Sequence, residues 1–196
     1  MGFYIFLGVL AALAIYVAVI YNNLVQNKNR GENGFAQIDV QLKRRYDLIP
    51  NLVETAKGYL SHERETLESV TAARNEAAQM LSKLSGNLAD VGAAQSLAAA
   101  EATLGGALGR LQVAVEAYPD LKASANMSQL SEELTSTENK VAFARQAYND
   151  AATEYNTYRQ SFPPLLFAGI FGHGADLAML EFADREKLEE APKVSF

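Results

Sequence analysis

Cysteine and tryptophan are absent from this 196-residue chain, and histidine occurs only as His62 and His173. The lack of cysteine excludes disulfides, thiolate nucleophiles and cysteine-ligated metals. Two histidines far apart in the sequence leave few options for imidazole chemistry. Apolar residues nevertheless make up 49% of the chain and charged residues 20%, so a core can be buried.

The pair His62-Glu63 is the closest approach to a catalytic motif. A zinc metalloprotease carries HExxH on a helix, with two imidazoles one turn apart, but position 66 is threonine. Phosphate-loop and dinucleotide glycine patterns are missing as well. A group of acidic residues matches no calcium loop and is typical of a solvated helix face: Glu32, Asp39, Glu63, Glu65 and Glu68. We therefore predict no enzyme activity, no catalytic residue, no metal site and no cofactor.

The first part of the chain lacks charge altogether. An apolar run extends from Phe3 to Tyr21, and no charged side chain precedes Lys28. A helix of about 20 residues crosses a bilayer core, and Tyr4 and Tyr21 lie where interfacial aromatic residues belong. A cleaved signal peptide is the alternative, but it requires an N-terminal base and a small-residue cleavage site. We predict a retained anchor over residues 1–27 and a juxtamembrane linker over residues 28–38.

Basic residues collect immediately after this run and none precedes it: Lys28, Arg30, Lys43, Arg44 and Arg45. The positive-inside rule then predicts a single-pass protein of the bacterial cytoplasmic membrane, with its N-terminus outside and its C-terminal domain in the cytoplasm. The five bases are predicted to act as an orientation signal and as a collar for membrane lipid. Because no broad basic face exists beyond them, nucleic-acid binding is not expected.

Apolar side chains recur at alternating steps of four and three residues from Leu42 to Leu84. Such heptad spacing, sustained over this length, predicts one long helix from about Ala36 to Ser85. Pro50 lies inside it and is predicted to kink the helix without ending it, because proline lacks a backbone N–H. Gly86 suits the left-handed position after the last turn.

Two further helices are predicted over 91–117 and 127–161, with Asp90 as the N-cap of the first and Asn126 opening the second. Pro119 and Pro163-Pro164 follow them. No stretch alternates with period two, so we predict an all-α fold, an N-terminal transmembrane helix followed by a long-helix up-and-down four-helix bundle over residues 39–162. Residues 163–196 are predicted to form an apolar glycine-rich segment, a short helix around 177–188 and a tail.

Several stretches of the sequence form a recognisable set: IDVQLKRRYDLIPNLV, the KGY–HE spacing at residues 57–63, AYPDLKA at 117–123, the Tyr-Asn pairs at 148 and 155, and the closing PKVSF. Together they resemble the LemA family. The resemblance covers nearly the whole chain. It implies a membrane-anchored bacterial protein with a four-helix-bundle domain, and it implies no reaction, cofactor or substrate.

Two charged residues, Glu63 and Arg74, occupy positions of the apolar stripe. An unpaired charge there would cost several kcal/mol, so both are predicted to make inward polar contacts. The two lie about 16 Å apart along one helix, too far to pair with each other. Glu138 or Tyr148 on the third long helix is the predicted partner of Arg74. The alternative is that Glu63 and Arg74 both lie at the rim of the bundle, in water.

Helix lengths predict where the stripe lacks cover. A second helix folded back from Gly86 would end near residue 59, which leaves the start of the first helix bare. Its apolar residues are then predicted to form an assembly interface between copies: Leu42, Tyr46, Ile49 and Val53. The rival hypothesis is that the first helix breaks at Gly58 and folds onto itself, which closes a monomeric four-helix bundle.

These patterns favour a membrane-anchored helical scaffold or adaptor that acts through homo-oligomeric assembly and has no catalytic activity of its own. The alternative is an accessory subunit of a membrane enzyme, such as a protease or transporter, with a membrane protein as partner.

Overall fold

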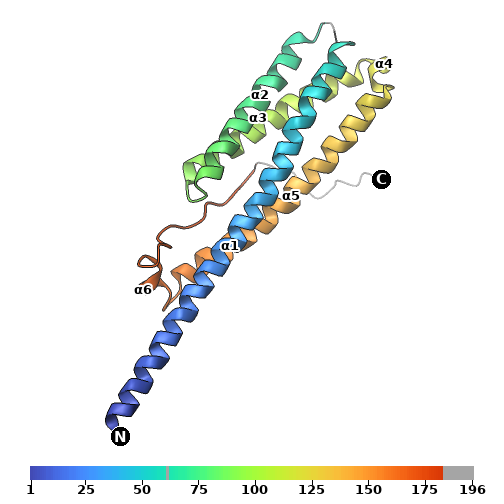
Figure 1. Ribbon diagram of the computed structural model, residues 1–196. Coiled ribbons are helices and arrows are strands. Elements are labelled where there is room, and N and C mark those ends of the chain that lie inside the picture. Colours follow the sequence, from blue (N-terminus) through green and yellow to red (C-terminus); the bar gives the residue numbers. More distant parts are fainter. Residues whose placement is uncertain (61, 183–196) are drawn as a thin grey trace, which may run out of the picture.

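The computed structural model describes residues 1–60 and 62–182, and in these residues every regular element is a helix. Four long helices follow one another: α1 (Gly2–Lys57), α2 (Arg64–Gly86), α3 (Val91–Glu116) and α5 (Ala125–Gln160). Two single turns, α4 (Pro119–Lys122) and α6 (Leu165–Ala168), follow α3 and α5 respectively. Figure 1 shows the long helices side by side in a rod, with α1 extending beyond the others at its N-terminal end. The predicted all-α class is confirmed.

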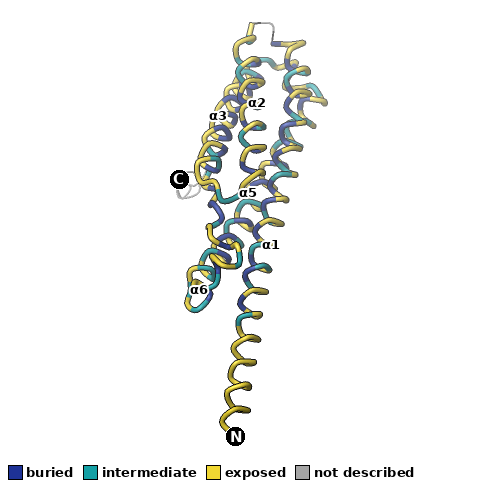
Figure 2. The backbone as a smooth tube through the Cα atoms, turned by 60° about the vertical axis from the view of Figure 1, so that its left-hand side comes forward, coloured by how far each residue is buried: buried dark blue, intermediate teal, exposed yellow. Residues whose placement is uncertain are grey.

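Helix α1 joins the apolar run to the bundle without interruption. Its first buried residue is Ile20, and nearly every side chain before it is exposed, as Figure 2 shows. This first part is long and apolar enough to cross a membrane, with a mean hydropathy of 2.6 over its best window. Residues 28–38, predicted as a linker, lie within the same helix. The apolar run and the bundle are therefore joined by continuous helix and not by a separate linker.

Two glycines in this part of α1 have a packing role. A Cβ atom on Gly34 would lie 3.1 Å from the Cα atom of Tyr148 in α5, and one on Gly31 would collide with the side chain of Leu177. These positions let α5 and the C-terminal segment approach the α1 backbone closely, which side chains would prevent. The pair α1 and α5 shares the most extensive contact in the bundle.

The predicted single helix from Ala36 to Ser85 is wrong, and the rival break at Gly58 is what the structure has. The N–H groups of Tyr59 and Leu60 both bond to the carbonyl of Ala56, which ends α1, and Leu60 is buried at 2% exposure. Helix α2 then runs back along α1. The heptad phase continues across the turn, because α1 and α2 each need an apolar stripe to pack against the other.

The later helices agree with the predicted ranges to within two residues. Asp90 caps α3 as predicted, since its carboxylate accepts a hydrogen bond from the N–H of Ala93. Gly86, however, is the last residue of α2 and has no positive φ. Helix α5 begins after Ser124, so Asn126 lies inside its first turn.

An extended segment, residues 173–182, follows α6. It was predicted to turn helical at Leu177, but residues 177–182 are not helical, and the remainder of that predicted helix lies outside the described residues. The segment binds α5 residues in descending order, so it runs antiparallel to α5. Its Ala178 N–H also donates to the Leu88 carbonyl in the turn between α2 and α3. We call it the strap.

Candidate functional site

The predicted assembly stripe lies inside the bundle. Leu42, Tyr46 and Ile49 are at most 2% exposed, and Val53 is half-buried against the same core. The prediction that these side chains lack cover within the chain is wrong, because α2 folds back from Gly58 and covers them. Leu42, Tyr46 and Ile49 therefore belong to the core of the chain, while Val53 lines an open pocket between α1 and α2.

A buried ion-pair cluster crosses the middle of the bundle. The Arg45 guanidinium of α1 donates through Nη1 to Glu101 of α3 at 2.7 Å and through Nη2 to Glu138 of α5 at 2.9 Å. Arg45 is only 8% exposed, so its predicted place in the lipid collar is wrong. Instead, this side chain pairs with residues of two other helices, and removing it would leave the buried Glu101 carboxylate without its cation, which is costly.

Tyr46 completes this cluster from the next position of α1. Its hydroxyl donates to the second carboxylate oxygen of Glu101. Burial raises the pKa of Tyr46, and the nearby Glu101 charge raises it further, so the phenol stays protonated. Burial also raises the pKa of Glu101, while Arg45 and the Tyr46 hydroxyl oppose that shift. Arg45, Tyr46 and Glu101 thus pair with one another inside the core, although Nε of Arg45 is buried without a hydrogen-bond partner.

Arg74 of α2 bonds the same part of α1, but not as predicted. Its Nε donates to the backbone carbonyl of Tyr46 at 3.0 Å, and its Nη2 lies 3.8 Å from the exposed carboxylate of Asp47. In a regular helix the Tyr46 carbonyl would accept from the N–H of residue 50, and Pro50 has none. Arg74 therefore supplies a donor that Pro50 removes.

The other predicted polar partners have different roles. Glu138 pairs with Arg45, and the Tyr148 hydroxyl donates to the Ala178 carbonyl of the strap at 2.7 Å, so neither contacts Arg74 as predicted. Glu63 precedes α2, half-buried, and its side chain makes no capping hydrogen bond there.

Paired asparagines on α5 hold the strap. The side-chain amide of Asn149 donates to the Leu180 carbonyl and accepts from the Leu180 N–H, each at 2.9 Å. Asn156 forms the same two-way pair with Leu177, at 2.9 and 2.8 Å. The two asparagines are seven residues apart, so they lie on one face of the helix. The Tyr-Asn repeat contributes to the family resemblance, but the role of its asparagines was not predicted, although their seven-residue spacing is visible in the sequence.

The tyrosines of the repeat add to this contact. The Tyr155 hydroxyl lies 3.2 Å from Nδ1 of His173, which is buried. Burial lowers the pKa of His173, and nearby Lys28 lowers it further. Arg159 and Gln160 both bond the carboxylate of Asp176. Side chains of α5 therefore form hydrogen bonds with the strap along its length.

An open groove separates α3 from α5. Its volume is about 740 Å³, and its lining mixes apolar side chains such as Leu108 and Leu134 with polar and charged ones such as Ser131 and Glu132; Leu52 of α1 also lines it. Gly105 and Gly109 face it, and a Cβ atom at either position would meet nothing within 4 Å. The other neighbouring long helices pack along each other. Glu138 lines the groove as well, which connects it to the buried cluster.

Comparisons with known proteins place this architecture in a family. The LemA family model matches residues 34–196. The chain belongs to the LemA family. It is 27% identical over 183 residues to magnetosome protein MamQ 2 of Paramagnetospirillum magneticum, covering 85% of this chain and 67% of the relative. It is 30% identical over 141 residues to protein LemA of Metamycoplasma hominis, covering 72% of this chain and 60% of the relative. The chain thus spans roughly two thirds of the length of these relatives.

In this LemA-family chain the remaining predicted collar residues lie on α1 beyond the apolar run. Lys28 pairs with Glu32 at 3.6 Å, Arg30 with Glu154 of α5 at 3.0 Å, and Lys43 with Asp39 at 2.7 Å. Arg44 is exposed. The family and the apolar helix support a membrane-anchored helical protein. Contact of these four bases with lipid stays a prediction.

Proposed function

We propose that this LemA-family protein is a membrane-anchored scaffold, which holds a helical rod at a fixed angle to the bilayer and assembles with further copies. The observation that carries the proposal is the continuity of α1, which is both the apolar run and the first helix of the bundle. A tether that only retained a protein at the membrane could be flexible. A single helix transmits the orientation of the anchor to the whole bundle.

The surface available for assembly is the α3–α5 groove, since the stripe on α1 is buried. The groove combines apolar and polar side chains with glycines that leave room for another helix to come close. Small residues at such a surface allow backbones to approach and pack. A second copy in the same bilayer is presented at the same height, which lowers the entropic cost of association.

Matched glycine variants test this proposal. Gly105→Leu with Gly109→Leu fills the groove, whereas Gly106→Leu places the same side chain on the same helix at a position that also has open space but does not line the groove. The particle mass of detergent-solubilised protein is measured for each. We expect an oligomer for the wild type and for Gly106→Leu, and a smaller particle for the double variant. A wild type that is monomeric at every concentration would exclude self-assembly.

The accessory-subunit hypothesis uses the same surface with a different occupant. It predicts that a stoichiometric second membrane protein purifies with the wild type and is lost from the Gly105→Leu, Gly109→Leu variant. A monomeric wild type carrying such a protein would favour this alternative.

We also propose the topology that the basic residues predict, with the N-terminus outside the bacterial cytoplasmic membrane and the bundle in the cytoplasm. The asymmetry of bases about the apolar run supports it.

A further inference from the structure

An exposed apolar segment lies between α5 and the strap. From Phe162 to Phe171 the sequence is FPPLLFAGIF, without one polar side chain. Phe162 and Ile170 are 80% and 79% exposed, and Leu165 and Leu166 are more than half exposed. Single exposed apolar residues are common on protein surfaces, but a continuous group of this size marks an interaction site. We call residues 162–171 the apolar turn.

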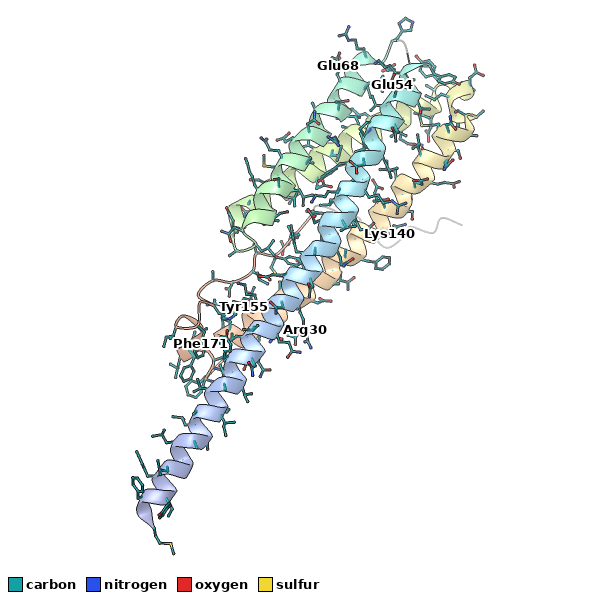
Figure 3. All side chains as sticks on the ribbon, viewed as in Figure 1. Arg30, Glu54, Glu68, Lys140, Tyr155 and Phe171 are labelled. Carbon is teal, nitrogen blue, oxygen red and sulfur yellow. The ribbon has the colours of Figure 1, made fainter. Side chains whose placement is uncertain are left out.

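The apolar turn packs against the end of the apolar run of α1. The rings of Phe171 and Tyr21 meet edge to face, with centroids 5.2 Å apart. Figure 3 shows Phe171 beside α1, on the N-terminal side of Arg30 and Tyr155. Ile20 is the first residue of α1 to be buried, and α6 contacts α1. The exposed surface of the apolar turn is thus continuous with the exposed surface of the membrane-spanning run.

The position along α1 matches the boundary of a bilayer. From Phe3 to Tyr21 a helix rises about 27 Å at 1.5 Å per residue, close to the roughly 30 Å of a hydrocarbon core. Tyr21 then lies at the boundary, and Phe171 lies beside it. The first charged residue, Lys28, follows about 10 Å further along the helix. The apolar turn falls between the hydrocarbon and the first charges, where aromatic and apolar groups enter the interface.

The backbone of the apolar turn is suited to this environment. A polar group that enters lipid must be paired, because no water is there to bond it. Pro163 and Pro164 have no N–H. Of the eight N–H groups in residues 162–171, five donate to carbonyls between Ser161 and Phe167, namely those of Leu165, Leu166, Phe167, Ala168 and Phe171. Most of the N–H groups of the turn are therefore paired before it reaches the interface.

We propose that the apolar turn inserts into the lipid interface beside α1 and forms a second membrane contact. This inference rests on the membrane anchor in the proposed function, and on no partner protein. Two contacts restrict rotation of the bundle about the anchor, which a single helix in lipid leaves free. The occupant is the acyl–headgroup boundary, because the surface continues that of the spanning run.

The absence of native tryptophan provides the test, since one introduced tryptophan is the only one to report. Ile170→Trp in the full-length protein is placed in nanodiscs of phosphatidylcholine and phosphatidylglycerol. Quenching lipids carry a label either near the headgroup or near the bilayer centre. We expect a blue-shifted emission, quenched more by the shallow label than by the deep one. Leu166→Trp provides a second position in case Ile170→Trp does not fold.

Two controls separate this inference from the anchor. Leu10→Trp lies in the middle of the apolar run and should be quenched most by the deep label, while the exposed Phe143→Trp on α5 should be quenched by neither. If Leu10→Trp is quenched but neither turn variant is, the second contact is refuted and the anchor stands. A turn tryptophan that is shielded from water but unaffected by both labels is covered by protein, which also refutes the proposal. If Leu10→Trp itself escapes quenching, the anchor fails and the inference with it.

Discussion

Pro50 and Arg74 are predicted to depend on each other, although they lie on different helices. Pro50 removes the N–H that would bond the Tyr46 carbonyl, and Arg74 bonds that carbonyl at 3.0 Å. Tyr46 is 2% exposed, so its carbonyl has little access to water. Arg74→Met keeps a long apolar stem but removes the donor. In the Pro50→Ala background the alanine N–H can bond the carbonyl, so the same change should matter less.

The size of the effect follows from the contacts. A buried acceptor left without a partner costs about 1–3 kcal/mol. The Asp47 contact adds little, because that carboxylate is 80% exposed and 3.8 Å away. For a chain of this length 1 kcal/mol corresponds to roughly 2–4 °C in melting temperature. Arg74→Met should therefore lower Tm by about 2–12 °C in the wild type.

A double-mutant cycle measures the dependence, with helical circular dichroism followed against temperature in detergent. The control Arg64→Met removes an arginine of the same helix whose side chain is 86% exposed and pairs with Glu68; it should change stability by less than about 0.5 kcal/mol. Equal costs for Arg74→Met in both backgrounds, within about 0.5 kcal/mol, would show that Arg74 does not substitute for the missing N–H.

Two further predictions concern packing and topology. Gly34→Ala should lower Tm, because its methyl group would lie 3.1 Å from the α5 backbone. The control Gly106→Ala adds a methyl group that meets no atom within 4 Å, so it should leave Tm unchanged or stabilise α3 by up to about 1 kcal/mol. Thermal melts with the opposite order would contradict the close α1–α5 approach. Protease added to intact spheroplasts should spare the bundle while protease added after lysis degrades it, and digestion from outside would place the domain on the other side of the membrane.

Residues of the core could be predicted from the sequence, but the order in which the helices fold back could not. Leu42, Ile49 and Leu81 were placed on one apolar stripe, and all three are buried. The break at Gly58 was only an alternative, because two helices that pack on each other can keep one heptad phase across a short turn. The low helix propensity of one glycine is weaker evidence for a break than a long heptad pattern is for a continuous helix. Tertiary packing nevertheless favours the break at Gly58.

The buried cluster could be predicted only in part. Glu101 falls on an apolar stripe of α3, and a charge there needs a partner. Arg45 was not identified as that partner, because its place beside Lys43 and Arg44 suggested a solvated basic group. The strap was beyond periodic analysis, since its backbone bonds to Asn149 and Asn156 depend on how an extended chain returns along α5.

The unbroken α1 also sets the distance between the apolar run and the far end of the bundle. From Tyr21, at the proposed membrane boundary, the helix rises about 46 Å to Leu52 beside the α3–α5 groove, and about 54 Å to Lys57. Gly31 packs against the strap and Gly34 packs against α5. An insertion or deletion in this part of α1 would therefore shift these glycines away from their contacts. Whatever the groove holds is kept at one distance from the lipid, and chain length in this segment sets that distance.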